Sequence, residues 1–120
     1  MTDTPQFRIR LVFGPDEMIG PGKAELLERI DRTGSIAAAG REMGMSYKRA
    51  WQLVEVMNAM FRAPLVDRTR GGARGGGANV TATGHAVLAA YRGIEFEAAR
   101  AGERHVAEIK ALMRDPGGGR

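Results

Sequence analysis

Residues 68–81, RTRGGARGGGANVT, combine glycines and arginines in a way that suits phosphate binding. Glycine lets the backbone approach a ligand closely, and arginine forms strong hydrogen bonds to phosphate oxygens. A Walker A loop needs a lysine and a hydroxyl residue after its last glycine, whereas Ala78 and Asn79 follow Gly77. A dinucleotide fingerprint needs a helix that begins directly after the glycines, whereas NVT intervenes. Both nucleotide-binding interpretations therefore fail.

Two other interpretations of this segment are a disordered basic linker and the tip of a β-hairpin that contacts nucleic acid. The segments on either side of the glycines, LVDRTR and ANVT, have the pattern of short strands. A linker would have to join two domains, for which 120 residues are too few. We therefore predict a hairpin whose DNA contacts are Arg68, Arg70, Arg74, Gly75 and Gly76.

A second group of candidate binding residues lies near the start of a predicted helix. Ser35 is a good N-cap for a short alanine-rich helix ending at Gly44, and Ser46 begins a second helix that runs to about Phe61. A short helix, a tight turn containing glycine and a longer helix form a helix-turn-helix. The buried face of the longer helix is predicted to consist of Ala50, Val54, Met57 and Phe61. The predicted DNA contacts of this region are Ser35, Ser46, Tyr47, Lys48, Arg49 and Gln52.

The distribution of charge supports contact with a polyanion. The chain carries a net charge of +4. Residues 46–84 hold six lysine and arginine residues against two acidic residues, whereas the segments before and after are nearly balanced. An excess of positive charge in one third of the chain is typical of a surface that meets nucleic acid.

The sequence offers no residue pattern for catalysis or metal binding. Cysteine is absent, which excludes disulfides and thiol catalysis. His85 and His105 lack partners at zinc-binding spacing, and no serine adjoins a histidine. We therefore expect no enzyme activity, no metal and no cofactor. Neither a signal peptide nor an apolar run of ~18 residues is found, so we expect a cytoplasmic protein without membrane contact.

Local patterns place these groups on a mainly helical scaffold with a small β part. Residues 6–14 alternate as a half-buried strand, residues 14–21 form a turn, and residues 22–32 form a helix. A further helix continues for roughly thirty residues from position 82. The predicted fold is a winged helix-turn-helix, with residues 1–81 as DNA-binding domain, 82–114 as a long dimerisation helix and 115–120 as a disordered tail.

The last predicted helix is too long for the core of so small a domain to cover. At ~1.5 Å per residue it spans ~45 Å, whereas a domain of this size is ~30 Å across. One alternative is a single helix that wraps its own domain, but the heptad-like spacing favours a homodimer. The predicted dimer contacts are Val87, Tyr91, Ile94, Ala98, Val106 and Ile109.

Over roughly residues 6–100, the chain resembles the N-terminal DNA-binding domain of the ModE family of molybdate-responsive transcription regulators. The resemblance is carried by the motifs IGPGKAELLERIDRTGSIAAAGREMGMSYKRAW, VEVMN and GGARGGGANVTATG. A weaker similarity to LysR-type winged helices covers GSIAAAGREMGMS and TATG.

The ModE resemblance implies a homodimer on an inverted-repeat operator, with Tyr47, Lys48 and Arg49 in the recognition helix. It also implies control of genes for molybdenum uptake or molybdoenzymes. The family's C-terminal molybdate-binding domains are absent from this sequence, so we expect a stand-alone regulator whose effector is unidentified.

Three questions stay open at this level. The winged helix could be a scaffold whose long helix binds a partner protein instead of DNA. Arg92 or Arg100 could hold an oxyanion between the helices of a dimer. Trp51 adjoins the buried face of its helix, and its indole could pack in the core or lie against sugar and phosphate.

Overall fold

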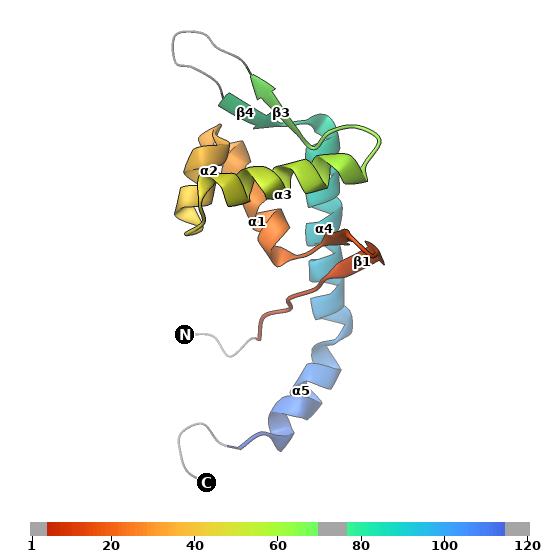
Figure 1. Ribbon diagram of the computed structural model, residues 1–120. Helices are drawn as coiled ribbons and strands as arrows, with labels where there is room; N and C mark the ends of the chain where they lie inside the picture. The colour runs from red at the N-terminus through yellow and green to blue at the C-terminus, as the bar shows by residue number, and fades with distance from the viewer. Residues whose placement is uncertain (1–4, 70–76, 115–120) are drawn as a thin grey trace.

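The computed structural model describes residues 5–69 and 77–114 of the chain. Its elements follow one another along the chain as drawn in Figure 1. They are β1 (Leu11–Gly14), β2 (Glu17–Ile19), α1 (Pro21–Thr33), α2 (Ile36–Glu42), α3 (Tyr47–Met60), β3 (Val66–Thr69), β4 (Gly77–Val80), α4 (Ala82–Ala101) and α5 (Glu103–Leu112). The predicted fold class, mainly helical with a small β part, is confirmed. The predicted tail, residues 115–120, lies outside the described residues.

The N-terminal strand is shorter than predicted, and a second strand lies where a turn was expected. β1 is only four residues long, and β2 turns back at Pro15 and Asp16 to pair with it antiparallel. Leu11 lies opposite Ile19, and the register shifts between Val12 and Gly14. The turn predicted over residues 14–21 is confined to Pro15 and Asp16, and the three-residue strand after it was missed because it is too short to show alternation.

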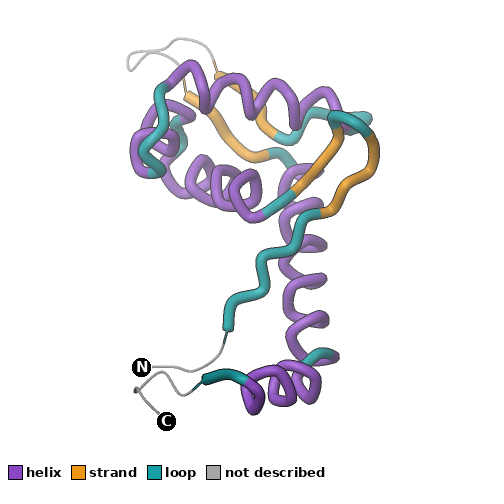
Figure 2. The backbone as a smooth tube through the Cα atoms, turned by 60° about the horizontal axis from the view of Figure 1, so that its bottom comes forward, coloured by secondary structure: helices purple, strands orange, loops and turns teal. Residues whose placement is uncertain are grey.

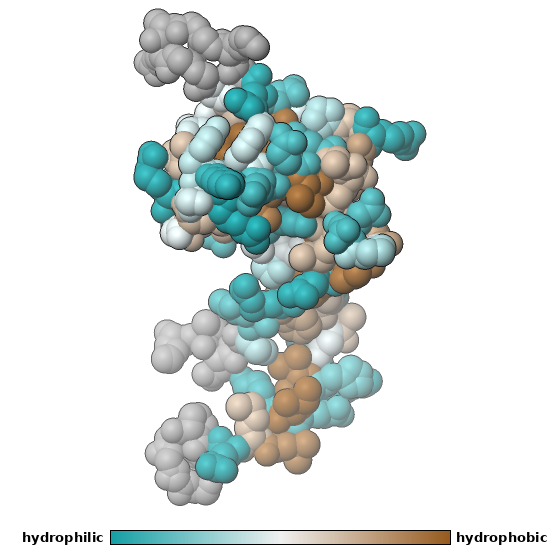
Figure 3. Space-filling view, viewed as in Figure 1, coloured by the Kyte–Doolittle hydropathy of each residue, from teal (hydrophilic) through white to brown (hydrophobic). Residues whose placement is uncertain are grey.

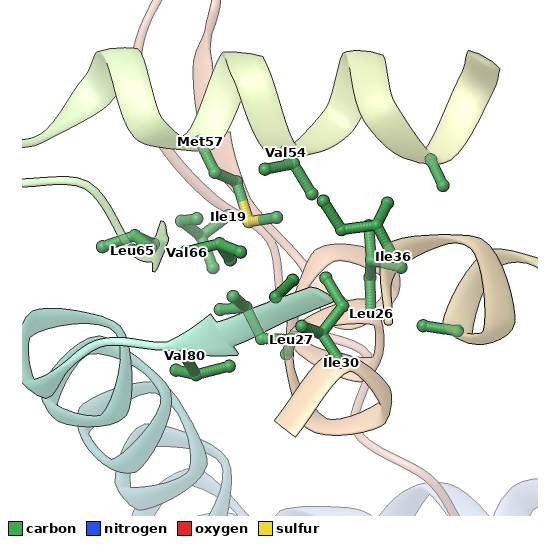
Figure 4. Packing of buried hydrophobic residues seen from close by; sticks show 14 of the residues in the cluster. Ile19, Leu26, Leu27, Ile30, Ile36, Val54, Met57, Leu65, Val66 and Val80 are labelled. Carbon is green, nitrogen blue, oxygen red and sulfur yellow. The ribbon is translucent and has the colours of Figure 1, made fainter. Parts of the chain in front are cut away.

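The three helices α1, α2 and α3 enclose one apolar core together with the β3–β4 hairpin (Figure 4). The predicted stripe of α1 is confirmed, since Leu26, Leu27 and Ile30 are fully buried. Gly34 ends α1 in the left-handed conformation, at φ 72°, where its N–H donates to the Ile30 carbonyl at 2.8 Å. The buried side chains that meet these residues are Ile19, Ile36, Val54, Met57, Leu65, Val66 and Val80.

Two polar side chains fix the hairpin to the helices on either side of it. The Asn58 amide oxygen accepts hydrogen bonds from the N–H groups of Leu65 at 2.8 Å and Val66 at 3.1 Å. Thr81 is the N-cap of α4, and its hydroxyl accepts from the Gly84 N–H at 2.9 Å. The same hydroxyl donates to the main chain just before β3. Both ends of the hairpin are therefore held at defined positions.

The long helix predicted from position 82 is broken into α4 and α5 at Gly102. Gly102 has φ −90° and ψ 1°, outside the helical range, and Figure 2 shows α5 bent away from the axis of α4. The Phe7 ring packs against Gly102, where a Cβ would come within 3.6 Å of it. Periodicity did not predict the bend, because apolar residues at helical spacing continue past Gly102.

Part of the predicted dimer surface on α4 packs against the core of its own domain. Tyr91 is only 2% exposed, and its hydroxyl donates to the Ile9 carbonyl at 2.5 Å, so it packs against its own domain. Its assignment to a dimer contact is therefore corrected. Val87 is half-buried against the same core, whereas Ile94 and Ile109 are 40% and 62% exposed. Figure 3 shows hydrophobic side chains gathered along this lower part of the molecule.

Among residues 5–69 and 77–114, no helix combines the length and apolar character needed to cross a membrane. The molecule is elongated, with principal extents of 61 × 30 × 23 Å, because α4 and α5 extend beyond the core (Figure 1).

Candidate nucleic-acid interface

The first turn of α3 carries the cluster of polar residues that the sequence predicted. The Ser46 hydroxyl accepts from the Arg49 N–H at 3.0 Å, which confirms Ser46 as the N-cap. The side chains of Tyr47, Lys48 and Arg49 lie in the first turn, and Gln52 follows one turn later. All four are exposed. They are presented to solvent because the opposite face of α3, with Ala50, Val54 and Met57, is buried.

The α2–α3 pair requires glycine at two positions, one in the turn between the helices and one within α2. Gly44 has φ 74°, a left-handed conformation that other residues adopt only with strain. At Gly40, an added Cβ would lie 2.8 Å from the Ala50 Cβ, so α2 and α3 can approach this closely only at a glycine. Ser35 caps α2 by accepting from the Ala38 N–H at 3.0 Å, as predicted. The turn therefore sets the angle at which α3 is exposed.

The β3–β4 hairpin, called the wing from here on, is antiparallel and in register, with Arg68 opposite Ala78. The Ala78 N–H donates to the Gly34 carbonyl at 3.0 Å, which attaches the wing to the end of α1. The predicted tip residues Arg70, Arg74, Gly75 and Gly76 lie outside the described residues.

Arg68 and Trp51 bring the wing and α3 together. The Arg68 guanidinium carbon lies 4.2 Å from the centre of the Trp51 ring, which is cation–π distance. Trp51 is half-buried, with part of its surface against the core and part beneath Arg68. Both sequence interpretations of Trp51 missed this contact, because no local pattern links positions 17 residues apart on different elements.

A hollow of about 320 Å³ separates the start of α3 from the wing. Tyr47, 52% exposed, contributes from α3, and Arg68 contributes from β3. The other lining residues are Ser35, Ile36, Ala37, Gly77 and Ala78. Predicted DNA contacts from three separate segments therefore line one concave surface.

Lys23 adds positive charge close to Arg49 of α3 and was not predicted. Its ammonium donates to the Met18 carbonyl at 2.8 Å. Burial lowers the pKa of Lys23, and the nearby charge of Arg49 lowers it further. Neither periodicity nor a motif marks this lysine, since only the fold places the start of α1 near α3.

Both histidines and Arg92 have carboxylate partners. His85 meets Asp31 at 3.0 Å and so joins α4 to α1, and no cluster of three potential metal ligands occurs in the described part of the chain. Arg92 donates to Glu28 at 2.7 and 2.9 Å and to Glu95 at 2.7 Å. The hydrogen bonds to Glu28 raise the pKa of Arg92, and the two carboxylates neutralise its charge. Arg92 is therefore poorly suited to the oxyanion site considered from sequence.

A capped helix pair with a glycine turn, a supporting helix and a following β-hairpin define a winged helix-turn-helix DNA-binding domain. The chain belongs to the family of bacterial regulatory helix-turn-helix proteins of the LysR type, whose model matches residues 22–85, more than half of the chain. The weaker of the two sequence resemblances is thus confirmed as family membership.

The resemblance to ModE regulators is also confirmed over the N-terminal region. The molybdenum-pterin-binding protein MopB of Rhodobacter capsulatus is 48% identical over 82 residues, which are 68% of this chain and 30% of MopB. The molybdenum transport protein ModE of Azotobacter vinelandii is 43% identical over 75 residues, 62% of this chain and 28% of that protein. The chain thus matches less than a third of the length of these relatives.

A solved structure supports the fold assignment. The crystal structure of the CbnR DNA-binding domain in complex with DNA matches with a TM-score of 0.55 and 25% sequence identity. The match covers 73% of this chain and 95% of that chain. This chain therefore contains a DNA-binding domain of the regulatory helix-turn-helix class.

Proposed function

We propose that the protein binds double-stranded DNA sequence-specifically as a homodimer and regulates transcription from an inverted-repeat operator. The observation that carries the proposal is the concave surface that Tyr47 of α3 and Arg68 of the wing both line, next to the exposed polar residues at the start of α3. In this arrangement Lys48, Arg49 and Gln52 contact bases in the major groove, and Arg68, Arg70 and Arg74 contact phosphates.

The proposal of a homodimer is supported by the apolar surface along α4 and α5. Large apolar side chains stay exposed there in the single chain, and they are Ile94, Phe96, Ile109, Leu112 and Met113. A groove of about 550 Å³ runs beside Ile94 and is bordered by small residues such as Ala90 and Gly93. Exposed apolar surface of this kind favours association with a second copy. A twofold dimer places two recognition helices on half-sites related by the same symmetry, which requires an inverted repeat.

The regulated genes are proposed to serve molybdenum uptake or molybdoenzymes. This part rests on the relatives, since the Azotobacter protein is a molybdenum transport protein and MopB binds molybdenum-pterin. Mapping binding sites across the genome of the source organism would test it, because enrichment away from molybdenum-related genes would contradict it.

A salt-titrated binding assay on operator and random duplexes tests DNA binding itself. Affinity should fall steeply as salt rises, because bound phosphates release counterions. The same exposed α4–α5 surface also suits a partner protein, so a complete lack of DNA binding at low salt would favour a protein-interaction module.

Lys48→Ala should reduce discrimination more than it reduces overall binding. If Lys48 contacts a base, the preference for operator over random DNA should fall about tenfold, the cost of one good base contact. Arg104→Ala is a matched control, because it removes one exposed positive charge from α5, which lies beyond α4 and away from α3. Competition binding with both duplexes measures the ratio. An equal loss on both duplexes would remove Lys48 from the base-contacting group.

Ser46 allows folding and DNA binding to be separated. Ser46→Ala removes the side chain that accepts from the Arg49 N–H and should cost about 1 kcal/mol of unfolding free energy. Ser46→Asp keeps an N-cap acceptor, so it should retain stability, but its negative charge would repel phosphate and weaken DNA binding. Urea unfolding and DNA titration of both variants check this. Undiminished DNA affinity in Ser46→Asp would place Ser46 away from the duplex.

A further inference from the structure

Arg68 of the wing and Trp51 of α3 form a cation–π contact. In the described part of the chain, it is the one such contact between the wing and α3. Arg68 is exposed, and its guanidinium carbon lies 4.2 Å from the ring centre of Trp51. Trp51 is one helical turn after Tyr47, so both aromatic rings lie on the side of α3 that faces the wing. Among residues 5–69 and 77–114, no carboxylate forms an ion pair with Arg68.

Stacking by its face leaves the edge of a guanidinium available. Arginine carries five N–H donors in a fixed plane, and a ring that covers the plane does not block them. A planar edge of this kind matches a phosphate, to which it can donate two parallel hydrogen bonds. The stack therefore orients the charge of Arg68 without neutralising it, unlike the carboxylates that engage Arg92.

The position of the stack is set from two directions. Arg68 lies opposite Ala78 in the wing, and the Ala78 N–H is bound to the Gly34 carbonyl. Trp51 is packed against the core on its other side. The guanidinium is thus held at the edge of the hollow that Tyr47 and Arg68 both line.

We propose that Trp51 is a positioning residue for DNA binding, which holds the Arg68 guanidinium by its face so that the N–H edge meets a backbone phosphate in the hollow between α3 and the wing. The inference rests on the proposed function and deepens it. The wing and α3 then act on the duplex as one unit, because a single phosphate is contacted at their junction. An arginine side chain normally loses conformational entropy when it binds a phosphate. Because Trp51 already holds Arg68 in place, this entropy cost is smaller.

The free protein provides the first test, since Trp51 is the only tryptophan in the chain. Removing the guanidinium should expose the indole, so Arg68→Ala should shift its fluorescence emission to longer wavelength and increase quenching by acrylamide. Arg62→Ala removes an exposed arginine from the connection after α3 and should leave both signals unchanged. Unchanged fluorescence in Arg68→Ala would show that the stack is absent in solution and would overturn the inference.

A double-mutant cycle on operator affinity provides the second test. Trp51→Leu and Arg68→Ala should each lower affinity about tenfold, and the double variant should be no weaker than Arg68→Ala alone. Arg68→Ala should also reduce the slope of log affinity against log salt by about one. Trp51→Phe keeps an aromatic face and should recover most of the affinity lost in Trp51→Leu. All variants are compared at a temperature at which thermal unfolding shows them to be folded.

The outcomes separate this inference from the proposed function. Additive losses in the cycle, with wild-type protein binding the operator, would overturn the positioning role alone. A loss in Trp51→Leu that Trp51→Phe does not recover, and that persists without Arg68, would indicate direct contact of the indole with DNA and would also overturn it. A wild-type protein that binds no duplex would overturn both.

Discussion

Gly84→Ala is expected to destabilise the fold by about 3 kcal/mol, the upper part of the range for forced overpacking. Gly84 lies in the first turn of α4, where the helix crosses the connection into the wing. A Cβ at this position would collide with the backbone carbonyl of Leu65 and lie 2.6 Å from the Val80 Cγ1. The carbonyl cannot move away easily, because Leu65 is also held by Asn58 and by the N–H of Thr81. Urea unfolding measures the loss.

Gly22→Ala is the matched control for this substitution. Gly22 lies in the first turn of α1, is exposed, and has nothing within 4 Å of an added Cβ. The same chemical change there should stabilise the protein by about 0.5 kcal/mol, because the unfolded chain loses freedom. If Gly84→Ala proved as harmless as Gly22→Ala, the close crossing of α4 over the wing connection would be wrong.

Ile94→Glu is expected to lower operator affinity by about 100-fold, because it would separate the proposed dimer and with it the advantage of two linked half-sites. Ile94 is exposed in the single chain, so a charge there should leave the protomer folded. Within a dimer contact, the same carboxylate would lie among apolar side chains without a partner. Sedimentation should therefore show a monomer, while circular dichroism stays that of the wild type.

Val12→Glu replaces an exposed apolar side chain with the same charge, but on β1, outside the proposed contact along α4 and α5. Val12 is 66% exposed in the single chain, compared with 40% for Ile94. This variant should remain dimeric and bind the operator as the wild type does. A dimeric Ile94→Glu protein with unchanged affinity would exclude this face of α4 from the dimer.

Local signals in the sequence were enough to predict the helix-turn-helix and its caps. Ser35 and Ser46 act as N-caps as predicted, since a hydroxyl that accepts from an N–H three residues later depends on adjacent backbone only. The buried stripe of α1 followed from periodicity in the same way. The exposed group at the start of α3 could be predicted because the opposite, apolar face of the helix must be buried.

Features that depend on distant segments could be found only in the tertiary structure. Phe7 lies next to Gly102 at the bend, and the buried Tyr91 donates to the Ile9 carbonyl, so both positions contact the other end of the chain. The stack of Arg68 on Trp51 likewise needs the wing to fold back over α3.

Composition and spacing thus determined which segments are helices and which surface of α3 is polar. The fold alone decided which side chains meet across those segments. The physical reason is that caps and periodicity act within a turn or two of backbone, whereas a contact between elements depends on how their buried faces pack.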